Sequence, residues 1–338
     1  MKKIFLIYVL AIIGTATLLV SSCKKNEIVP VKQLPVLTTA NVTNITKNTA
    51  TAGGKIYETG YTEITASGVV WDTAHNPSVE KHLGITTDGA KDVGEFTSNL
   101  TGLNAATTYY VRAYATNSVG TAYGSEKGFR TEAEPITVTD ADGNVYHGVT
   151  IGAQVWTVEN LKTTKYNDGT DIPLVTDGAA WDALDVETGG AYCWYNNDIS
   201  NKDAYGAIYN FAAIKTGKLA PAGWHVPTME EWQTLIDQLG GKDVAGGKLK
   251  EAGTTHWNSP NSDATNSSGF TALPGGFRYT GATNFFGLND FALFQTSTEE
   301  ASNPGAWSYY AILFKDNGTI DLRYWIKQAG CSVRLVKD

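Results

Sequence analysis

Residues 223–232 read Gly-Trp-His-Val-Pro-Thr-Met-Glu-Glu-Trp, and this stretch predicts where a helix begins in the C-terminal half of the chain. The hydroxyl of Thr228 can accept a hydrogen bond from the first turn, and Glu231, three residues on, can return one to the amide of Thr228, which makes a capping box. The apolar residues that follow recur at helical spacing: Trp232, Leu235, Ile236 and Leu239. Gly240 and Gly241 can then end the helix. The paired glutamates are explained by capping and need no catalytic role.

Segments with strand character lie on both sides of this helix. Residues 145–156 follow Asp142-Gly143, a dipeptide typical of a type I′ hairpin turn. Apolar residues at helical spacing within 205–212 predict a further helix. Two strand-like runs close the chain, at 311–314 and 332–336. Helices and strands segregated in this way indicate an α+β domain, which we place at residues 135–338, after the boundary dipeptide Glu134-Pro135.

The N-terminal half has a different pattern. Between residues 35 and 132, short alternating runs are separated by turn residues, which predicts an all-β sandwich. The clearest strand runs from Tyr109 to Asn117, where every second residue is apolar and should face the core. The residues before it resemble the start of strand F in fibronectin type III domains, since they read Leu103-Asn104-Ala105-Ala106-Thr107-Thr108-Tyr109. The resemblance implies a fibronectin type III-like domain in which Tyr109 is the tyrosine corner, its hydroxyl bonded to nearby backbone.

The N-terminus has the features of an export signal. Lys2 and Lys3 precede an apolar run that ends in Val20-Ser21-Ser22-Cys23, which resembles the lipobox of bacterial lipoproteins. We expect residues 1–22 to be a cleaved signal peptide, Cys23 to be acylated, and residues 23–34 to be a flexible tether. The alternative, a transmembrane anchor, is disfavoured because the run is barely long enough to cross a bilayer. The predicted location is the outer membrane.

The orientation at that membrane stays open. In some lipoproteins of the Bacteroidota, an acidic cluster after the lipidated cysteine directs the protein to the cell surface. Here the chain continues Lys24-Lys25-Asn26-Glu27, which is a poor match. Periplasm-facing and surface-facing orientations are therefore both compatible with the sequence.

Charge excludes one class of partner. The 338 residues include 34 acidic and 26 basic side chains, for a formal charge of −8, and no dense run of Lys or Arg occurs. Such a chain repels a phosphate backbone more than it attracts one, so we expect no nucleic-acid binding.

Two cysteines remain once Cys23 is assigned to lipid. In an oxidising compartment, a disulfide between Cys193 and Cys331 is the default expectation. Two separate buried thiols are the alternative. A metal site is the least favoured interpretation, because no His lies at zinc-finger spacing from either Cys, and we expect neither a metal nor a cofactor.

Several motifs of the C-terminal half occur together in one known family. They include Val149-Thr150-Ile151-Gly152-Ala153-Gln154-Val155-Trp156, Gly223-Trp224-His225-Val226-Pro227-Thr228 and Leu273-Pro274-Gly275-Gly276. These motifs resemble those of the Fibrobacter succinogenes major paralogous domain, from about Val138 to the C-terminus. Members of that family are typically secreted or lipid-anchored and lack an established activity. The same blocks resemble formylglycine-generating-enzyme and C-type-lectin-like domains, which implies that fold, with its first and last strands paired.

The resemblance leaves two functions to compare. In the first, the protein is an exported, lipid-anchored, non-enzymatic binding or adhesion module for glycan or protein ligands. In the second, it is an oxidoreductase of the formylglycine-generating type or a degenerate relative. That chemistry uses two cysteines close together near the C-terminus, and only Cys331 lies there, so we favour the first.

The candidate ligand site is the long polar stretch 254–269. Long loops in compact domains are usually functional or disordered, and in lectin-like folds the long loop region binds ligands. Trp257 could offer a flat face to a sugar ring, while Asn258, Asn261 and Asp263 could supply hydrogen bonds or calcium ligands. The alternative is that Trp257 packs beneath the loop and the polar residues only solvate it.

Overall fold

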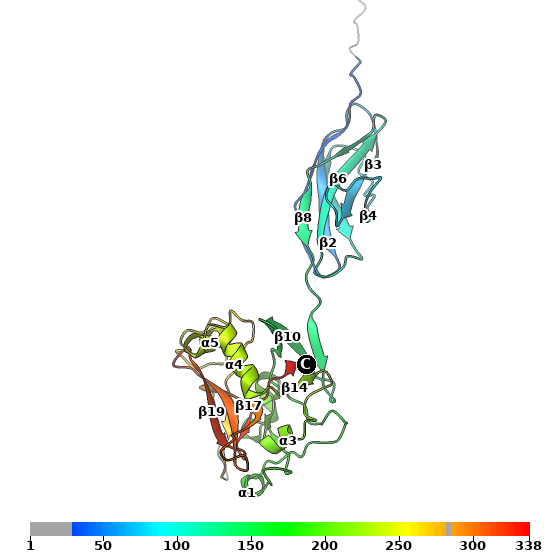
Figure 1. Cartoon of the computed structure of the whole chain (residues 1–338). Helices are drawn as coiled ribbons and strands as arrows, with labels where there is room; N and C mark the ends of the chain where they lie inside the picture. Colours follow the sequence, from blue (N-terminus) through cyan, green and yellow to red (C-terminus); the bar gives the residue numbers. More distant parts are fainter. Residues whose placement is uncertain (1–28, 282–284) are drawn as a thin grey trace, which may run out of the picture. The chain divides into compact units, whose positions relative to one another are not determined.

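A computed structural model describes residues 29–281 and 285–338 (Figure 1). The chain divides into two compact units, Met1–Glu134 and Pro135–Asp338, at the dipeptide singled out from the sequence. The predicted signal peptide and Cys23 lie outside the described residues. Each unit is described by itself below.

The first unit is a sandwich of two antiparallel sheets. One sheet contains β1 (Val36–Thr39), β2 (Ala50–Glu58) and β5 (Gly94–Leu100). The other has the order β4-β3-β6-β7, from β3 (Ile64–Asp72), β4 (Gly84–Ile85), β6 (Thr108–Asn117) and β7 (Thr121–Tyr123), and β8 (Lys127–Arg130) also pairs with β6. The predicted β-sandwich is confirmed.

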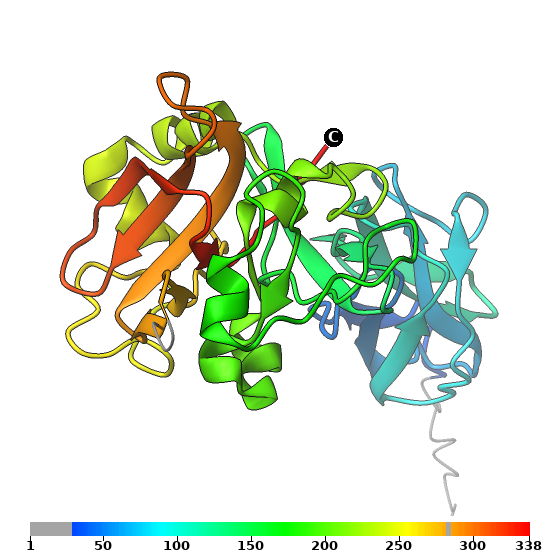
Figure 2. The same ribbon diagram turned by 90° about the horizontal axis from the view of Figure 1, so that it is seen from below.

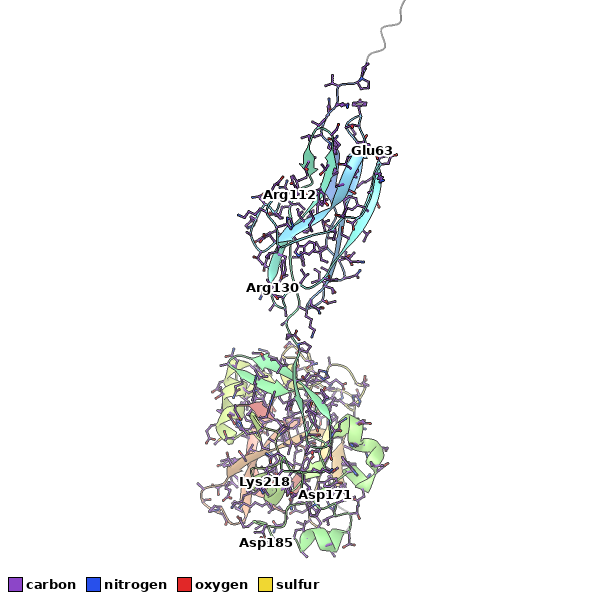
Figure 3. The ribbon with its side chains drawn as sticks, turned by 90° about the vertical axis from the view of Figure 1, so that its right-hand side faces the viewer. Glu63, Arg112, Arg130, Asp171, Asp185 and Lys218 are labelled. Atoms are coloured by element: carbon purple, nitrogen blue, oxygen red, sulfur yellow. The ribbon has the colours of Figure 1, made fainter. Side chains whose placement is uncertain are left out.

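Strand β6 follows the predicted alternation. Its buried side carries Tyr109, Val111, Ala113 and Ala115, which pack against apolar residues of the opposite sheet. The hydroxyl of Tyr109 accepts a hydrogen bond from the amide of Asn104 at 2.9 Å, so the predicted tyrosine corner is present. On the other side, Arg112, labelled in Figure 3, lies over the ring of Tyr123, 4.6 Å from its centroid. That contact ties β7 to the sheet.

The second unit begins with a five-stranded antiparallel sheet of order β14-β21-β11-β10-β9. Its strands are β9 (Ile136–Thr139), β10 (Val145–Ile151), β11 (Gln154–Thr157), β14 (Trp224–His225) and β21 (Val336–Lys337). Strand β21 pairs with β11 through Trp156 and Val336, so strands from the two ends of this unit lie side by side. The C-type-lectin-like assignment itself stays a prediction.

An eight-stranded sheet forms the rest of the second unit. Its order is β12-β13-β20-β15-β17-β18-β19, and β16 pairs with β15. The strands are β12 (Tyr192–Cys193), β13 (Ile208–Tyr209), β15 (Gly275–Arg278), β16 (Phe285–Leu288), β17 (Phe291–Glu299), β18 (Trp307–Phe314), β19 (Ile320–Ile326) and β20 (Gly330–Cys331). The short helices are α1 (Gly178–Asp182), α2 (Lys202–Tyr205), α3 (Phe211–Lys215) and two 3-10 turns, Tyr195–Asn197 and Ile199–Asn201.

Helices α4 (Met229–Gln238) and α5 (Lys242–Leu249) lie against one face of β17, β18 and β19 (Figures 1 and 2). Alternate strand residues point to opposite faces, so Ala311 and Leu313 pack under the helices. Tyr310 and Ile312 point the other way. We call this second side, which also carries Leu293, the aromatic face.

Helix α4 has the ends that the sequence predicts. Thr228 Oγ1 accepts from the amide of Glu231 at 3.1 Å, and Glu231 Oε2 accepts from the amide of Thr228 at 2.8 Å, so the capping box is confirmed. Trp232, Leu235 and Ile236 are buried. Gly240 and Gly241 follow with φ of 100° and 93°, which L residues with a side chain rarely adopt.

Two local predictions are wrong. The expected helix over 205–212 is interrupted, because Gly206 has φ of 74° and the chain continues into β13 before α3 begins. The expected two-residue turn at Asp142-Gly143 is a longer loop, since the carboxylate of Asp140 accepts from the amides of Asp142 and Asn144, both at 2.9 Å, and orders residues 140–144.

The predicted disulfide is also wrong, because Cys193 and Cys331 are free, buried thiols. Cys193 lies opposite Ile208 of β13, whereas Cys331 lies opposite the next residue, Tyr209. Neighbouring residues of a strand point to opposite faces, so the thiols are on opposite sides of the sheet with β13 between them. Two strand spacings amount to about 10 Å, which exceeds the roughly 7 Å between Cα atoms that a disulfide can span.

Candidate functional site

The loop 254–269 is held by its own tryptophan. Trp257 is only 1% exposed, and its Nε1–H donates to the carbonyl oxygen of Ala272 at 3.0 Å. It packs in the core cluster that includes Phe270 and Leu249. The prediction that Trp257 offers a face to a sugar ring is therefore wrong, because both faces of the indole are covered by the protein.

A buried lysine completes the support of this loop. The ammonium group of Lys250 lies 5.3 Å from the centroid of the Trp257 ring. It donates three hydrogen bonds, to the carbonyl oxygens of Ser262 (2.8 Å), Phe314 (2.9 Å) and Asn317 (2.8 Å). Burial lowers the pKa of Lys250 to about 8, against the raising effect of nearby carboxylates. At neutral pH the group stays charged and all three N–H groups donate.

The polar residues predicted for the same site do not form a shared ligand set. The amide of Asn258 donates to a carboxylate oxygen of Asp290 at 3.0 Å. Asn261 is buried, and its amide donates to two carbonyls of the preceding loop at 2.9 and 2.6 Å. Asp263 is exposed. The interior of this loop is thus a structural network.

Two histidines that follow or precede a tryptophan in the sequence make hydrogen bonds to carboxylates. His225 contacts Asp338 through Nδ1 at 2.6 Å and Glu231 through Nε2 at 2.8 Å. His256 contacts Glu251 through Nδ1 at 2.8 Å. Both nitrogens of His225 face carboxylate oxygens; burial acts to lower the pKa of the ring, but its hydrogen bonds to Asp338 and Glu231 outweigh burial and raise the pKa, which favours the protonated ring.

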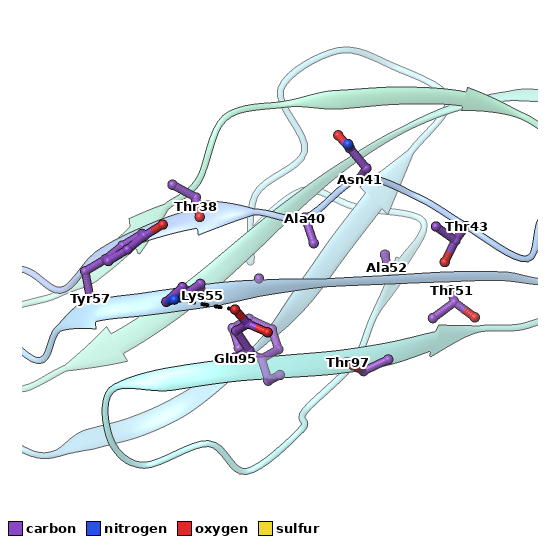
Figure 4. Close-up of a pocket in the computed structure, with 12 residues that line it drawn as sticks. Thr38, Ala40, Asn41, Thr43, Thr51, Ala52, Lys55, Tyr57, Glu95 and Thr97 are labelled. Carbon is purple, nitrogen blue, oxygen red and sulfur yellow. Dashed lines mark hydrogen bonds and ion pairs between the residues drawn. The ribbon is translucent and has the colours of Figure 1, made fainter.

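A groove of about 400 Å³ crosses the outer side of β1, β2 and β5 in the first unit (Figure 4). Its lining is mostly Thr, Ala and Gly, with Tyr57 and Phe96 as its aromatic residues, and Tyr57 is 51% exposed. The charged groups in it, Lys55 and Glu95, pair with each other at 3.4 Å. The groove therefore offers a ligand one exposed ring beside a neutralised ion pair.

A cluster of aromatic rings lies on the aromatic face of the second unit. The ring of Trp325 lies 5.3 Å from that of Phe277 and 5.2 Å from that of Tyr279, and Phe277 lies 5.7 Å from Phe286, all between ring centroids. We call these four residues the aromatic cluster. Phe286 is 46% exposed and Trp325 is 36% exposed. These two rings present flat apolar surface to solvent.

A pocket of about 270 Å³ adjoins Trp325. The pocket is lined by Leu293, Tyr310, Ile312, Arg323, Tyr324 and Trp325. Apart from Arg323, these side chains are aliphatic or aromatic. Arg323 contributes no unpaired charge, because its Nη2–H donates to Asp321 at 2.6 Å. The pocket and the aromatic cluster together make a mostly apolar surface on the aromatic face, over strands β15 to β19.

Burial also determines the protonation of the two thiols and of the tyrosine near this surface. Burial raises the pKa of Cys331 well above that of an ordinary thiol, so it stays protonated. Burial also raises the pKa of Tyr310, whose hydroxyl donates to the carbonyl oxygen of Ile326 at 2.7 Å. On the far side of the sheet, burial raises the pKa of Cys193 to about 11, although Arg278 opposes the shift. Neither thiol is activated for nucleophilic chemistry.

Residues 149–337 match the family model described as the Fibrobacter succinogenes major domain, which is more than half of the chain. The chain belongs to this family. The aromatic cluster, the pocket and both free cysteines all lie within the Fibrobacter succinogenes major domain. No curated protein matches the chain.

Three solved structures similar to the chain each align with 30% of it. The sensor domain of the anti-sigma factor RsgI4 of Pseudobacteroides cellulosolvens is 15% identical over 30% of this chain and 97% of that one, with a TM-score of 0.23. The third fibronectin III domain of the human KIAA0343 protein is 14% identical over 30% of this chain and 86% of that one, with a TM-score of 0.21. A redesigned β-sandwich protein is 25% identical over 30% and 97%, with a TM-score of 0.22. The first unit, with its two sheets and its tyrosine corner, is a fibronectin-like β-sandwich.

Two findings on the described residues concern membrane-spanning helices and metal-binding groups. Among residues 29–281 and 285–338, no helix has the length and apolar character needed to cross a membrane. Within the same ranges, no group of three or more His, Cys, Asp or Glu side chains is arranged to hold a metal ion.

Sequence reasoning missed the aromatic cluster in the Fibrobacter succinogenes major domain. Its members come from separate strands, β15, β16 and β19, or lie just after one. One signal was available. In the run Ile320–Ile326 the aromatic residues Tyr324 and Trp325 are adjacent, and adjacent strand residues cannot both face the same core.

Proposed function

We propose that the protein is an exported, lipid-anchored cell-envelope protein whose Fibrobacter succinogenes major domain binds glycans without catalysis. The observation that carries this proposal is the aromatic cluster beside the pocket, with Phe286 and Trp325 exposed. Solvent-exposed apolar surface of this kind is a common mark of a binding site.

The chemistry of the surface favours a saccharide ring over a charged ligand. The C–H groups of a sugar ring pack on the face of an aromatic ring, and the flat rings of Trp325 and Phe286 provide such faces. The Arg323 guanidinium at the rim is neutralised by Asp321, so no net charge selects an ionic ligand. The rim pair can still exchange hydrogen bonds with sugar hydroxyls.

A C-type-lectin-like fold for this domain is part of the proposal. The pairing of β11 with β21 brings together strands from its two ends, as that fold requires. The capped helix α4 against the strands supports the same assignment.

The formylglycine-generating alternative has less support. That chemistry needs two cysteines that act together, and Cys193 and Cys331 lie on opposite faces of the sheet with their pKa values raised by burial. No observation on these residues favours an oxidoreductase.

The test is a screen of the full chain against immobilised oligosaccharides, followed by titration of any glycan that binds. We expect Trp325→Ala to weaken that binding at least tenfold with little change in melting temperature, because the side chain is partly exposed. Tyr61→Ala is the control. Tyr61 is an aromatic residue of the first unit, is 65% exposed and lines neither the pocket nor the aromatic cluster, so its loss should leave affinity unchanged.

Phe286→Ala on β16 provides a second variant should Trp325→Ala unfold the domain. The proposal fails if no oligosaccharide binds, or if both Trp325→Ala and Phe286→Ala bind as the natural chain does. Binding to matrix proteins in place of glycans would assign the surface to a protein ligand.

A further inference from the structure

Strand β19 forms an open edge of the eight-stranded sheet. It is the last strand in the sheet order, and among the described residues only β18 pairs with it. Arg323, Tyr324 and Trp325 are successive exposed residues in this strand. Edge strands of monomers are usually protected by Lys, Pro or a bulge, because their free N–H and C=O groups recruit other strands. The sequence Ile-Asp-Leu-Arg-Tyr-Trp-Ile contains neither Lys nor Pro, and its two charged residues, Asp321 and Arg323, have opposite signs and pair with each other.

The hydrogen-bond pattern fixes which residues direct their backbone outward. The carbonyl oxygen of Trp307 in β18 accepts a hydrogen bond from the amide of Glu300 at 3.0 Å, so it points away from β19. At the end of the β18–β19 ladder, the amide of Lys327 donates to the carbonyl oxygen of Ala306 at 2.8 Å. Bonding alternates along an antiparallel ladder. Following the register, Asp321, Arg323 and Trp325 bond to β18. The backbone groups of Ile320, Leu322 and Tyr324 therefore point away from the sheet.

These outward residues restrict how a second β19 strand can pair about a two-fold axis. Outward residues must lie opposite outward residues, so within the strand's central part the axis can pass through Asp321, Leu322 or Arg323. An axis at Asp321 places two aspartates opposite each other, and an axis at Arg323 places two arginines opposite each other. Like charges directly opposite are unfavourable.

With the axis at Leu322, opposite charges face each other across the two strands. This axis places Asp321 of each copy opposite Arg323 of the other, so two cross-strand charge pairs form. It also sets Leu322 against Leu322 and Ile320 against Tyr324. The strand is thus complementary to itself in charge and in apolar contacts in one register only.

We propose that β19 pairs antiparallel with β19 of a second copy of this chain, with the two-fold axis at Leu322. The two eight-stranded sheets then form one continuous sheet. Because the axis is perpendicular to the sheet, the aromatic faces of both copies lie on the same side. This inference rests on the edge alone and stands whether or not the aromatic cluster binds glycans.

The first test uses disulfide trapping in the full chain purified in detergent. Residues directly opposite in a hydrogen-bonded pair have Cα atoms about 5.5 Å apart, within disulfide reach, so Leu322→Cys should give a linked dimer on mild oxidation. Tyr324→Cys is the control. Its two copies would be offset by four residues, or about 13 Å, and should stay unlinked although Tyr324 is more exposed.

The second test reverses charge without touching the core. Arg323 has 63% of its side chain exposed, so Arg323→Asp should fold, and in sedimentation it should shift the chain towards monomer by placing acidic groups opposite each other. The double variant Asp321→Arg with Arg323→Asp restores the complementary pairs and should restore the dimer.

Three results would overturn the proposal. They are a natural chain that sediments as a monomer at all concentrations, equal trapping of Leu322→Cys and Tyr324→Cys, and an Arg323→Asp chain that associates as the natural one does. Unchanged glycan binding in a monomeric chain would reject the β19 dimer while leaving the proposed function intact.

Discussion

At the scale of single residues, Lys250 connects the polar loop to the sheet. Its ammonium group is fully buried and donates to three carbonyl oxygens from two separate segments, the loop itself and the end of β18 with the turn that follows. A buried charge is tolerated only when its hydrogen bonds are made, and here all three are made. The loop conformation therefore depends on one side chain that no local sequence pattern identifies.

We expect Lys250→Met to destabilise the second unit by about 2–4 kcal/mol, because the methionine fills the space but leaves three buried carbonyls without donors. Urea unfolding followed by tryptophan fluorescence measures this, since eight of the nine tryptophans lie beyond residue 134. Lys242→Met, at an exposed position on α5, should stay within about 0.5 kcal/mol of the natural chain. Equal stability of the two variants would contradict the role of Lys250.

The burial of Trp257 could not be predicted from the sequence alone. A tryptophan in a long polar loop is compatible with exposure or with burial, and the choice depends on partners distant in sequence. Its hydrogen-bond acceptor, Ala272, is 15 residues away, and the lysine over its ring belongs to α5's C-terminal end. Periodicity carries no information about such partners, whereas Trp232, on the regular stripe of a helix, was placed correctly.

At the scale of secondary-structure elements, predictions succeeded where the signals were local. Helix α4 has a capping box, an apolar stripe and two terminal glycines, which all act within a few residues. Strand β6 alternates between buried and more exposed residues except at Tyr114, which is buried as well. The helix predicted over 205–212 does not form as one element. The helical spacing of apolar residues continues across Gly206, but the positive φ of Gly206 interrupts the helix. The disulfide failed because strand order, which separates Cys193 from Cys331 by β13, is not encoded in spacing.

His225 links three elements, since its ring on β14 contacts Glu231 of α4 and Asp338, the residue after β21. Burial acts to lower the pKa of His225, but the hydrogen bonds and charges of Asp338 and Glu231 outweigh it, and the pKa is raised above 6.5. A pKa raised on folding means that the folded protein holds the proton more tightly than the unfolded chain. The resulting stability is complete below the unfolded pKa and is lost as pH rises through the folded one.

We therefore expect the free energy of unfolding of the natural chain to fall, relative to that of His225→Gln, across the pH window that begins at about 6.5, because the pKa of His225 is raised on folding. Urea unfolding at several pH values in that window measures both chains. The His225→Gln chain serves as the reference for the natural chain, because the two chains share all other titratable groups. Parallel stability profiles across the window would show that His225 is not held as a cation.

At the scale of the whole molecule, the proposed anchor and the proposed edge pairing reinforce each other. Chains tethered to one membrane are confined near its surface, so their effective concentration for β19 pairing is much higher than in solution. A pair presents two aromatic clusters on one side of a continuous sheet. Two weak glycan contacts made together bind a polymeric ligand more tightly than either alone.

This arrangement requires that Cys23 carries lipid. One acyl chain gives only marginal membrane binding, whereas two or three hold a protein durably, since each buried methylene contributes about 0.8 kcal/mol. We expect the mature protein to begin at an acylated Cys23, and mass spectrometry of its N-terminal peptide from detergent extracts measures this. Cys23→Ser should leave the N-terminus unprocessed, while Cys193→Ser, at a buried thiol, should be processed as the natural chain is. A natural chain with a free Cys23 on an intact N-terminus would remove both the anchor and the gain in effective concentration that it supplies.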